Sequence, residues 1–156
     1  MKPLHARVYQ ILTILLSVIL AALIYKFLMG ATTTQSEDGR ATFEVTSSEA
    51  AHIRGDMRRF LNSLQQISQG LAEDNMAMVA ETAKQIGHSN KHGAPVTLMA
   101  KLPADFRKLG FATHSGFDEI AAKAEAGDKE AVIGLLASTT KNCVACHESF
   151  GITLSQ

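Results

Sequence analysis

The sequence predicts an all-α protein: an antiparallel four-helix bundle preceded by a single N-terminal transmembrane helix. Three observations support this prediction. An uncharged apolar run lies near the N-terminus, four segments with apolar residues at helical spacing follow it, and no segment shows a clear strand pattern. The 156 residues are rich in helix-forming types and are enough for one domain with its own core.

The first expected element is a membrane-spanning helix. Residues 8–25 carry no charge, and a helix over residues 8–29 is about 33 Å long at about 1.5 Å per residue, close to the hydrocarbon core of about 30 Å. Lys2 and Arg7 precede this run, and the positive-inside rule keeps them in the cytoplasm. We therefore expect residues 1–29 to cross a bacterial inner membrane once, with the rest of the chain in the periplasm.

A cleaved signal peptide is the alternative interpretation of this segment. The apolar region of a signal peptide spans about 7–15 residues and ends at a small-residue cleavage site. The run in this chain is longer, and the nearest candidate site, Met29-Gly30-Ala31, has a bulky methionine where a small residue is needed. We expect a retained anchor, and under either interpretation the main domain is exported.

A polar linker is expected after the anchor. Residues 30–48 are polar and show no helical repeat, so they are expected to tether the domain formed by residues 49–156. Phe43 and Val45 are apolar exceptions that can dock on this domain.

Four amphipathic helices are expected after the linker, and residue types typical of helix ends mark them. These are Thr46 with Glu49 (a capping box), Gly70, Asp74, Gly87, Pro103, Gly127 and Asp128. Short turns join the first helix to the second and the third to the fourth, so both pairs should be antiparallel. A loop of a dozen residues or more separates the two pairs, and loops of that length often line functional sites. The last helix is expected to include Phe150.

The strongest chemical signal is the motif Cys143-Val144-Ala145-Cys146-His147, because C-x-x-C-H is the signature of c-type haem attachment. Residues three and four apart on a helix share a face. Both thiols can therefore reach the two vinyl groups on one side of a porphyrin, while His147 places an imidazole nitrogen on the iron. One covalently bound haem c is the expected cofactor.

Three other interpretations of the cysteine pair are weaker. A thioredoxin-like redox pair belongs at the start of a helix in a βαβ setting, and no strands are expected here. A zinc site lacks a second pair of ligands at regular spacing. A disulfide is unfavourable between consecutive turns of one helix.

With C-x-x-C-H in the last of four helices, residues 48–152 resemble the cytochrome c′ family (class II cytochromes c). The stretches Phe106-Arg107-Lys108-Leu109-Gly110 and His114-Ser115-Gly116-Phe117 also look similar to the family, less specifically. The resemblance implies a four-helix bundle, thioether bonds at both cysteines of the motif and His147 as the proximal iron ligand.

The chain departs from the family pattern in two places. Members often have an aromatic and then a basic residue after the motif, whereas Phe150 is followed here by Gly151. Familiar members are soluble periplasmic proteins, whereas this chain begins with an apolar segment.

The resemblance also implies a role for Met57. Low-spin members carry a methionine at this place that binds iron opposite the histidine, whereas members with an apolar residue there leave the position open to NO or CO. Met57 lies on the apolar stripe of the first helix, where plain packing is the alternative role. Weaker candidates for the sixth ligand are Met76, Met78, Met99 and His114, of which His114 is expected to be a hydrogen-bonded structural group. His88 and His92 are expected to be solvated.

Arg54 and Arg58 lie on the turns around Met57, and either guanidinium can bind a haem propionate. A solvated helix face is the alternative for at least one of them.

Composition and motifs together predict the function class. The 15 Lys and Arg residues balance the 15 Asp and Glu residues, which argues against a nucleic-acid partner. We expect a membrane-anchored periplasmic cytochrome, not an enzyme, that transfers electrons to redox partner proteins in or near the membrane. The alternative is a five-coordinate haem module that binds NO or CO. The sequence leaves a homodimer open.

Overall fold

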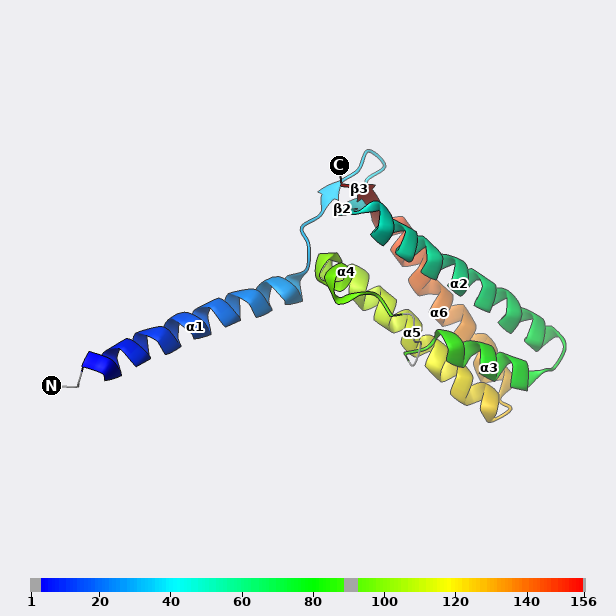
Figure 1. Cartoon of the computed structure of the whole chain (residues 1–156). Helices are drawn as coiled ribbons and strands as arrows, with labels where there is room; N and C mark the ends of the chain where they lie inside the picture. Colours follow the sequence, from blue (N-terminus) through cyan, green and yellow to red (C-terminus); the bar gives the residue numbers. More distant parts are fainter. Residues whose placement is uncertain (1–3, 89–92, 156) are drawn as a thin grey trace.

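The computed structural model describes residues 4–88 and 93–155, and helices make up most of them (Figure 1). Six helices and three short strands lie in this part of the chain. In chain order they are α1 (Leu4–Met29), β1 (Thr34–Gln35), β2 (Ala41–Val45), α2 (Ser47–Ala72), α3 (Met76–Ile86), α4 (Val96–Lys101), α5 (Ala104–Glu125), α6 (Lys129–Ser149) and β3 (Phe150–Leu154).

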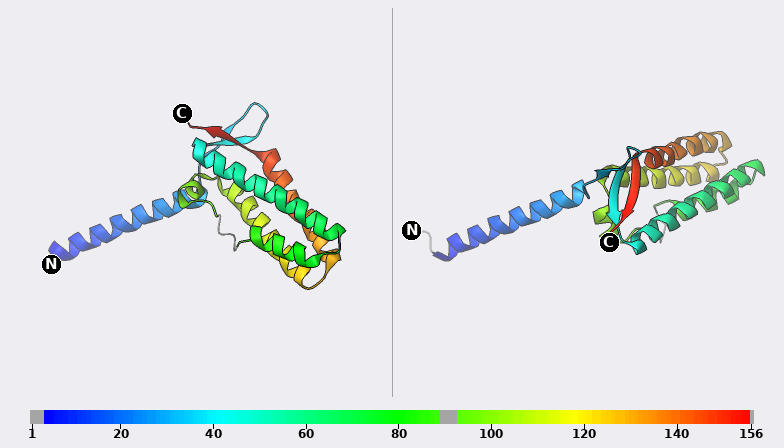
Figure 2. Two further views of the ribbon diagram at one scale, coloured as in Figure 1. Left: turned by 45° about the vertical axis from the view of Figure 1, so that its right-hand side comes forward. Right: turned by 90° about the horizontal axis from the view of Figure 1, so that it is seen from above.

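The apolar N-terminal helix is present as α1, which projects away from the rest of the chain (Figures 1 and 2). Its segment Ala6–Met29 is long and apolar enough to cross a membrane, and it is not buried inside the protein. A signal sequence shares these properties. Lys2, one of the charges used to orient the segment, lies outside the described residues.

The expectation of a purely α-helical chain is wrong, because a three-stranded sheet stands at one end of the helices (Figure 2). Strand β2 pairs antiparallel with β1 and parallel with β3. Phe43 and Val45 of β2 are each only 1% exposed, so this part of the expected linker belongs to the core. The strand signal is weak because each strand is short and the partner of β2 lies more than a hundred residues along the chain.

Most predicted helix ends are confirmed. Thr46 and Glu49 form the expected capping box, in which the Glu49 backbone N–H donates to Thr46 Oγ1 and the Thr46 N–H donates to the Glu49 carboxylate. The Asp128 carboxylate accepts from the Ala131 N–H at the start of α6.

Three predicted boundaries need correction. Asn75 rather than Asp74 caps α3, because the chain turns at Asp74 with a positive φ of 52°. Helix α2 continues past Gly70, and Phe150 begins β3 instead of extending α6. A Cβ at Gly70 would lie 2.8 Å from Val79 Cγ2, so this glycine allows α2 and α3 to approach closely and does not end the helix.

The buried side chains form two separate clusters. We call the first the turn-end cluster; it joins α2, α3, α5 and α6 through Ile67, Leu71, Val79, Ala80, Ala83, Ile86, Phe117, Ile120, Ala121, Ala124 and Val132. We call the second the sheet-end cluster; it consists of Phe43, Val45, Ala50, Leu98 and Leu102, with Ile53, Phe106, Phe150 and Ile152 packed against it. No residue belongs to both clusters, so the apolar core is interrupted along the length of the helices.

Two contacts set the register between α5 and α6. A Cβ at Gly116 would lie 2.3 Å from Thr139 Oγ1, so the two helices meet closely at this level. Nearer the sheet, the Phe106 and Phe150 rings meet edge to face with centroids 5.5 Å apart. The helices run antiparallel between these contacts.

We predict that Gly116→Ala destabilises the protein by about 1–3 kcal/mol, because the added methyl group overpacks the contact with Thr139. Gly134→Ala is the matched control: Gly134 lies inside α6 with no atom near its would-be Cβ. This change should stabilise the helix by about 0.5–1 kcal/mol. Urea unfolding followed by circular dichroism measures both, and equal effects would contradict the close contact.

Candidate functional site

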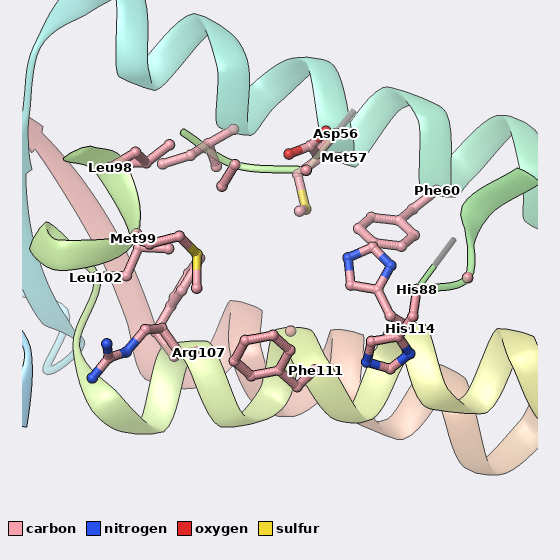
Figure 3. Close-up of a pocket in the computed structure, with 16 residues that line it drawn as sticks. Asp56, Met57, Phe60, His88, Leu98, Met99, Leu102, Arg107, Phe111 and His114 are labelled. Carbon is pink, nitrogen blue, oxygen red and sulfur yellow. The ribbon is translucent and has the colours of Figure 1, made fainter. Parts of the chain in front are cut away.

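A pocket of about 220 Å³ lies in the interruption between the two clusters (Figure 3). Helix α2, helix α5, helix α4 and the segment before α4 form its walls. Its lining is mainly apolar and comprises Ile53, Asp56, Met57, Phe60, Gly87, His88, Gly93, Ala94, Leu98, Met99, Leu102, Phe106, Arg107, Gly110, Phe111 and His114. An apolar pocket with a few polar groups is the usual form of a ligand site.

The C-x-x-C-H motif lies in the last two turns of α6 and does not line this pocket. Cys143 and Cys146 are half-buried and His147 is exposed. The contacts of Gly116 with Thr139 and of Phe106 with Phe150 bracket the motif on α6 and residues 107–115 on α5. The motif therefore lies alongside the stretch of α5 that contributes Gly110, Phe111 and His114 to the pocket.

Met57 lies in the pocket wall, as expected of a residue on the inner face of the first helix. Its neighbours at one turn on either side, Ile53 and Phe60, pack against different clusters, so Met57 stands at the interruption of the core. Met99, a weaker candidate from the sequence, lines the same pocket from α4. Figure 3 shows both thioether sulfurs facing the space between α2 and α5.

Two histidines stand at the end of the pocket farther from Arg107 (Figure 3). His114 Nδ1 lies 2.6 Å from the Ile86 carbonyl oxygen, and since a carbonyl only accepts, Nδ1 is the donor of this hydrogen bond. The expectation that His114 is hydrogen-bonded is therefore confirmed. His88 is exposed but not simply solvated, because its Nδ1 lies 2.7 Å from the Asp118 carboxylate and its ring stacks on Phe111. His92 lies outside the described residues.

The structure does not bring Arg54 and Arg58 into the pocket: both are exposed on α2. Arg59, which the sequence did not single out, pairs with the pocket-lining Asp56, and its Nε is buried without a hydrogen-bond partner in the described structure. Arg107 lines the pocket from α5. Arg59 and Arg107 are thus the arginines closest to the pocket wall.

Met76 and Met78 lie away from the pocket. Met76 packs against the turn-end cluster. Met78 is half-buried on α3. Neither residue lines the pocket.

Both cysteines of the motif are free thiols. Burial raises the pKa of Cys143, and burial together with the neighbouring Cys143 raises the pKa of Cys146. The thiols are therefore protonated at neutral pH and retain the S–H groups that thioether formation needs.

The donor chemistry fits a covalently held haem. Two free thiols and an imidazole follow one another at helical spacing on α6, and a thioether sulfur from α2 lines the neighbouring pocket. In the described ranges, 4–88 and 93–155, no three His, Cys, Asp or Glu side chains gather as a metal site. In a haem the macrocycle supplies four ligands to the iron. His147 and Met57 are the imidazole and the thioether that could supply the other two.

The sequence missed several residues of the pocket. Asp56 and Arg59 flank Met57 on the same helix, and their charges made them look like surface residues. Phe111 and Arg107 project from α5, but their role depends on how α4 folds back over that helix. Helical spacing from Phe106 to His114 was the signal that could have grouped them on one face.

No protein-family model, curated protein or solved structure matches this chain.

We predict that both thiols of the haem-free chain react with iodoacetamide at pH 8 several-fold more slowly than the same thiols in the urea-unfolded chain. The thiolate is the reactive form, and raising the thiol pKa lowers its fraction at that pH. Mass spectrometry of the alkylated peptide follows both rates. Equal rates in the folded and unfolded chains would contradict the burial of this pair.

Proposed function

We propose that this chain is a membrane-anchored c-type cytochrome that transfers electrons in the periplasm. Cys143 and Cys146 hold the haem by thioether bonds, His147 is the proximal iron ligand and Met57 is the distal ligand. When bound, haem supplies an iron that cycles between the ferric and ferrous states. The proposal includes a bundle of α2, α3, α5 and α6 similar to that of the cytochrome c′ family.

The observation that carries the proposal is the interruption of the core at the level of the motif. A continuous core would fill the space between α2, α5 and α6 with aliphatic side chains. Here, instead, Met57 and His114 line a pocket between the two clusters, and the half-buried motif cysteines lie at the same level on α6. A thioether and an imidazole in that pocket support a cofactor between the clusters better than they support packing alone.

Electron transfer requires an iron whose surroundings change little on reduction. Met57 comes from the long helix α2 and His147 from the long helix α6, so rigid elements hold both proposed ligands. For the haem propionates, Arg59 and Arg107 are better placed than Arg54 and Arg58, because they adjoin the pocket while the other two are exposed.

The contacts of α1 support a retained anchor. Arg107 donates to the backbone carbonyls of Phe27 and Leu28 at the end of this helix. Cleavage at Met29-Gly30-Ala31 would remove the partners of a side chain that also lines the pocket. We therefore propose that the helix stays attached and holds the haem domain on the periplasmic side of the membrane, near its redox partners.

We predict that haem stays on the wild-type chain in denaturing gel electrophoresis, because thioether bonds survive unfolding. The double variant Cys143→Ala/Cys146→Ala should lose all haem staining under these conditions. Single variants should keep a reduced amount through the remaining bond. The wild-type protein is purified from cells that attach haem to other c-type cytochromes. If it carries no covalent haem, the proposed function is refuted.

We predict that Met57→Leu changes the oxidised haem from low spin to high spin, because leucine has similar volume but offers no sulfur to the iron. Met99→Leu is the matched control: it removes the other thioether of the pocket and should leave a low-spin spectrum. Visible absorption spectroscopy measures the haem spin state of both variants. A change caused by Met99→Leu alone would assign the ligand to Met99 instead.

Binding of carbon monoxide to the reduced protein distinguishes the proposed electron-transfer function from gas binding. Reduced wild-type protein should bind CO slowly or not at all, and Met57→Leu should bind it rapidly. A wild-type chain that is high spin and binds CO at once would favour the alternative, a five-coordinate module for NO or CO.

A further inference from the structure

The end of α1 is held firmly against the rest of the protein. The backbone carbonyls of the last helical turn lack partners within the helix and carry its partial negative charge. Arg107 of α5 supplies those partners: its Nη1 lies 2.9 Å from the Phe27 oxygen and its Nη2 lies 2.5 Å from the Leu28 oxygen. The same guanidinium lies 5.5 Å from the centre of the Phe27 ring, a cation–π contact.

The chain immediately after α1 is equally tight. Gly30 has a φ of +71°, a conformation that favours glycine, and a Cβ at this position would lie 2.3 Å from the Leu102 carbonyl oxygen. The backbone of residue 30 therefore lies directly against the junction of α4 and α5. Together with Arg107, this contact forms a fixed joint between the end of α1 and the junction of α4 and α5.

The joint brings α4 next to the point where α1 ends. Figures 1 and 2 show α4 beside the C-terminal end of α1. Val96, the first residue of α4, has a side chain that is 76% exposed, the largest exposed fraction among the exposed large apolar residues described. Lys101 ends α4, where it pairs with Glu49, and the exposed Lys108 follows Arg107 on α5; Asp105 is the acidic residue in the first turn of α5.

We propose that α4 and the first turns of α5 rest on the lipid headgroups of the bilayer that α1 crosses, with Val96 inserted among them. This inference depends on the proposed membrane anchor. If α1 spans the bilayer, Phe27 and Leu28 lie at its outer interface, and Arg107 is hydrogen-bonded to both. Helix α4 is only about 9 Å long at about 1.5 Å per residue, so all of it stays close to that interface.

Lipid is the occupant that the observations favour over a protein partner. The apolar surface of α1 and the exposed Val96 adjoin one another across a fixed joint, so one bilayer can cover both. An exposed aliphatic side chain next to a helix that carries an exposed lysine, Lys108, suits the interface of an anionic membrane.

The placement has a consequence for the pocket. Arg107, Leu102 and Met99 line its end nearest to α1, so that end lies at headgroup level. A redox partner that approaches this end is therefore embedded in the membrane or bound at its surface.

Tryptophan fluorescence tests the inference, because the native chain contains no Trp and each substitution creates a single emitter. The full chain is reconstituted in vesicles of zwitterionic and anionic phospholipids, with or without bromine near the headgroup end of the acyl chains. For Leu16→Trp, which lies near the middle of the apolar span, the bromine is placed near the ends of the acyl chains instead. Bromine quenches Trp fluorescence on contact. For each variant, the intensity in brominated vesicles is divided by the intensity in unbrominated vesicles, so that any constant quenching by haem cancels. The variants are Leu16→Trp in α1, Val96→Trp in α4 and Ile133→Trp, which is 52% exposed near the start of α6 at the opposite end of the domain.

We predict strong quenching for Leu16→Trp, clear quenching for Val96→Trp and none for Ile133→Trp. Adding Arg107→Gln to Val96→Trp should reduce its quenching, because the joint loses two hydrogen bonds. If Leu16→Trp is quenched while Val96→Trp behaves like Ile133→Trp, the docking is refuted and the anchor stands. If Leu16→Trp is not quenched, the proposed anchor itself is wrong. Circular dichroism confirms that each variant is folded.

Discussion

The close contact of α5 with α6 at Gly116 and Thr139 is the constraint on which the rest of the site depends. With only a hydrogen atom on residue 116, the two backbones approach until the Thr139 side chain fills the gap. This contact sets the level of every later residue of α6 against α5, including Cys143 and Cys146. One extra residue in α6 between Thr139 and Cys143 would rotate both thiols by about 100° relative to α5.

The divided core explains how a largely helical domain can leave room for a cofactor without losing its fold. Helices α2 and α5 contribute to both clusters; α3 and α6 complete the turn-end cluster, and β2, β3 and α4 complete the sheet-end cluster. The stretch between them can therefore carry polarisable or ionisable groups such as Met57 and His114 at little cost in packing. Functional sites commonly depart from ideal packing in this way.

The helices were predictable because their signals are local, whereas the sheet and the pocket depend on contacts between distant segments. The Thr46 capping box and the Asp128 cap involve residues three positions apart, which a sequence shows directly. Phe43 becomes a core residue through contacts with distant segments: β3 pairs with its strand, and Phe106 of α5 packs against its ring. Met99 joins Met57 only because α4 folds back over α5, and no pattern within the loop predicts that path.

The parallel pairing of β2 with β3 ties the start of the folded domain to its last residues. Closing a loop of this length costs chain entropy and makes the pairing a late event in folding. During synthesis, β2 therefore waits for β3, which follows the cysteine motif directly. Until then the sheet-end cluster has no cover from Phe150 and Ile152, and the last turns of α6 are more open than in the finished protein. The order of the chain thus leaves the two thiols accessible during the period in which the proposed haem attachment would take place.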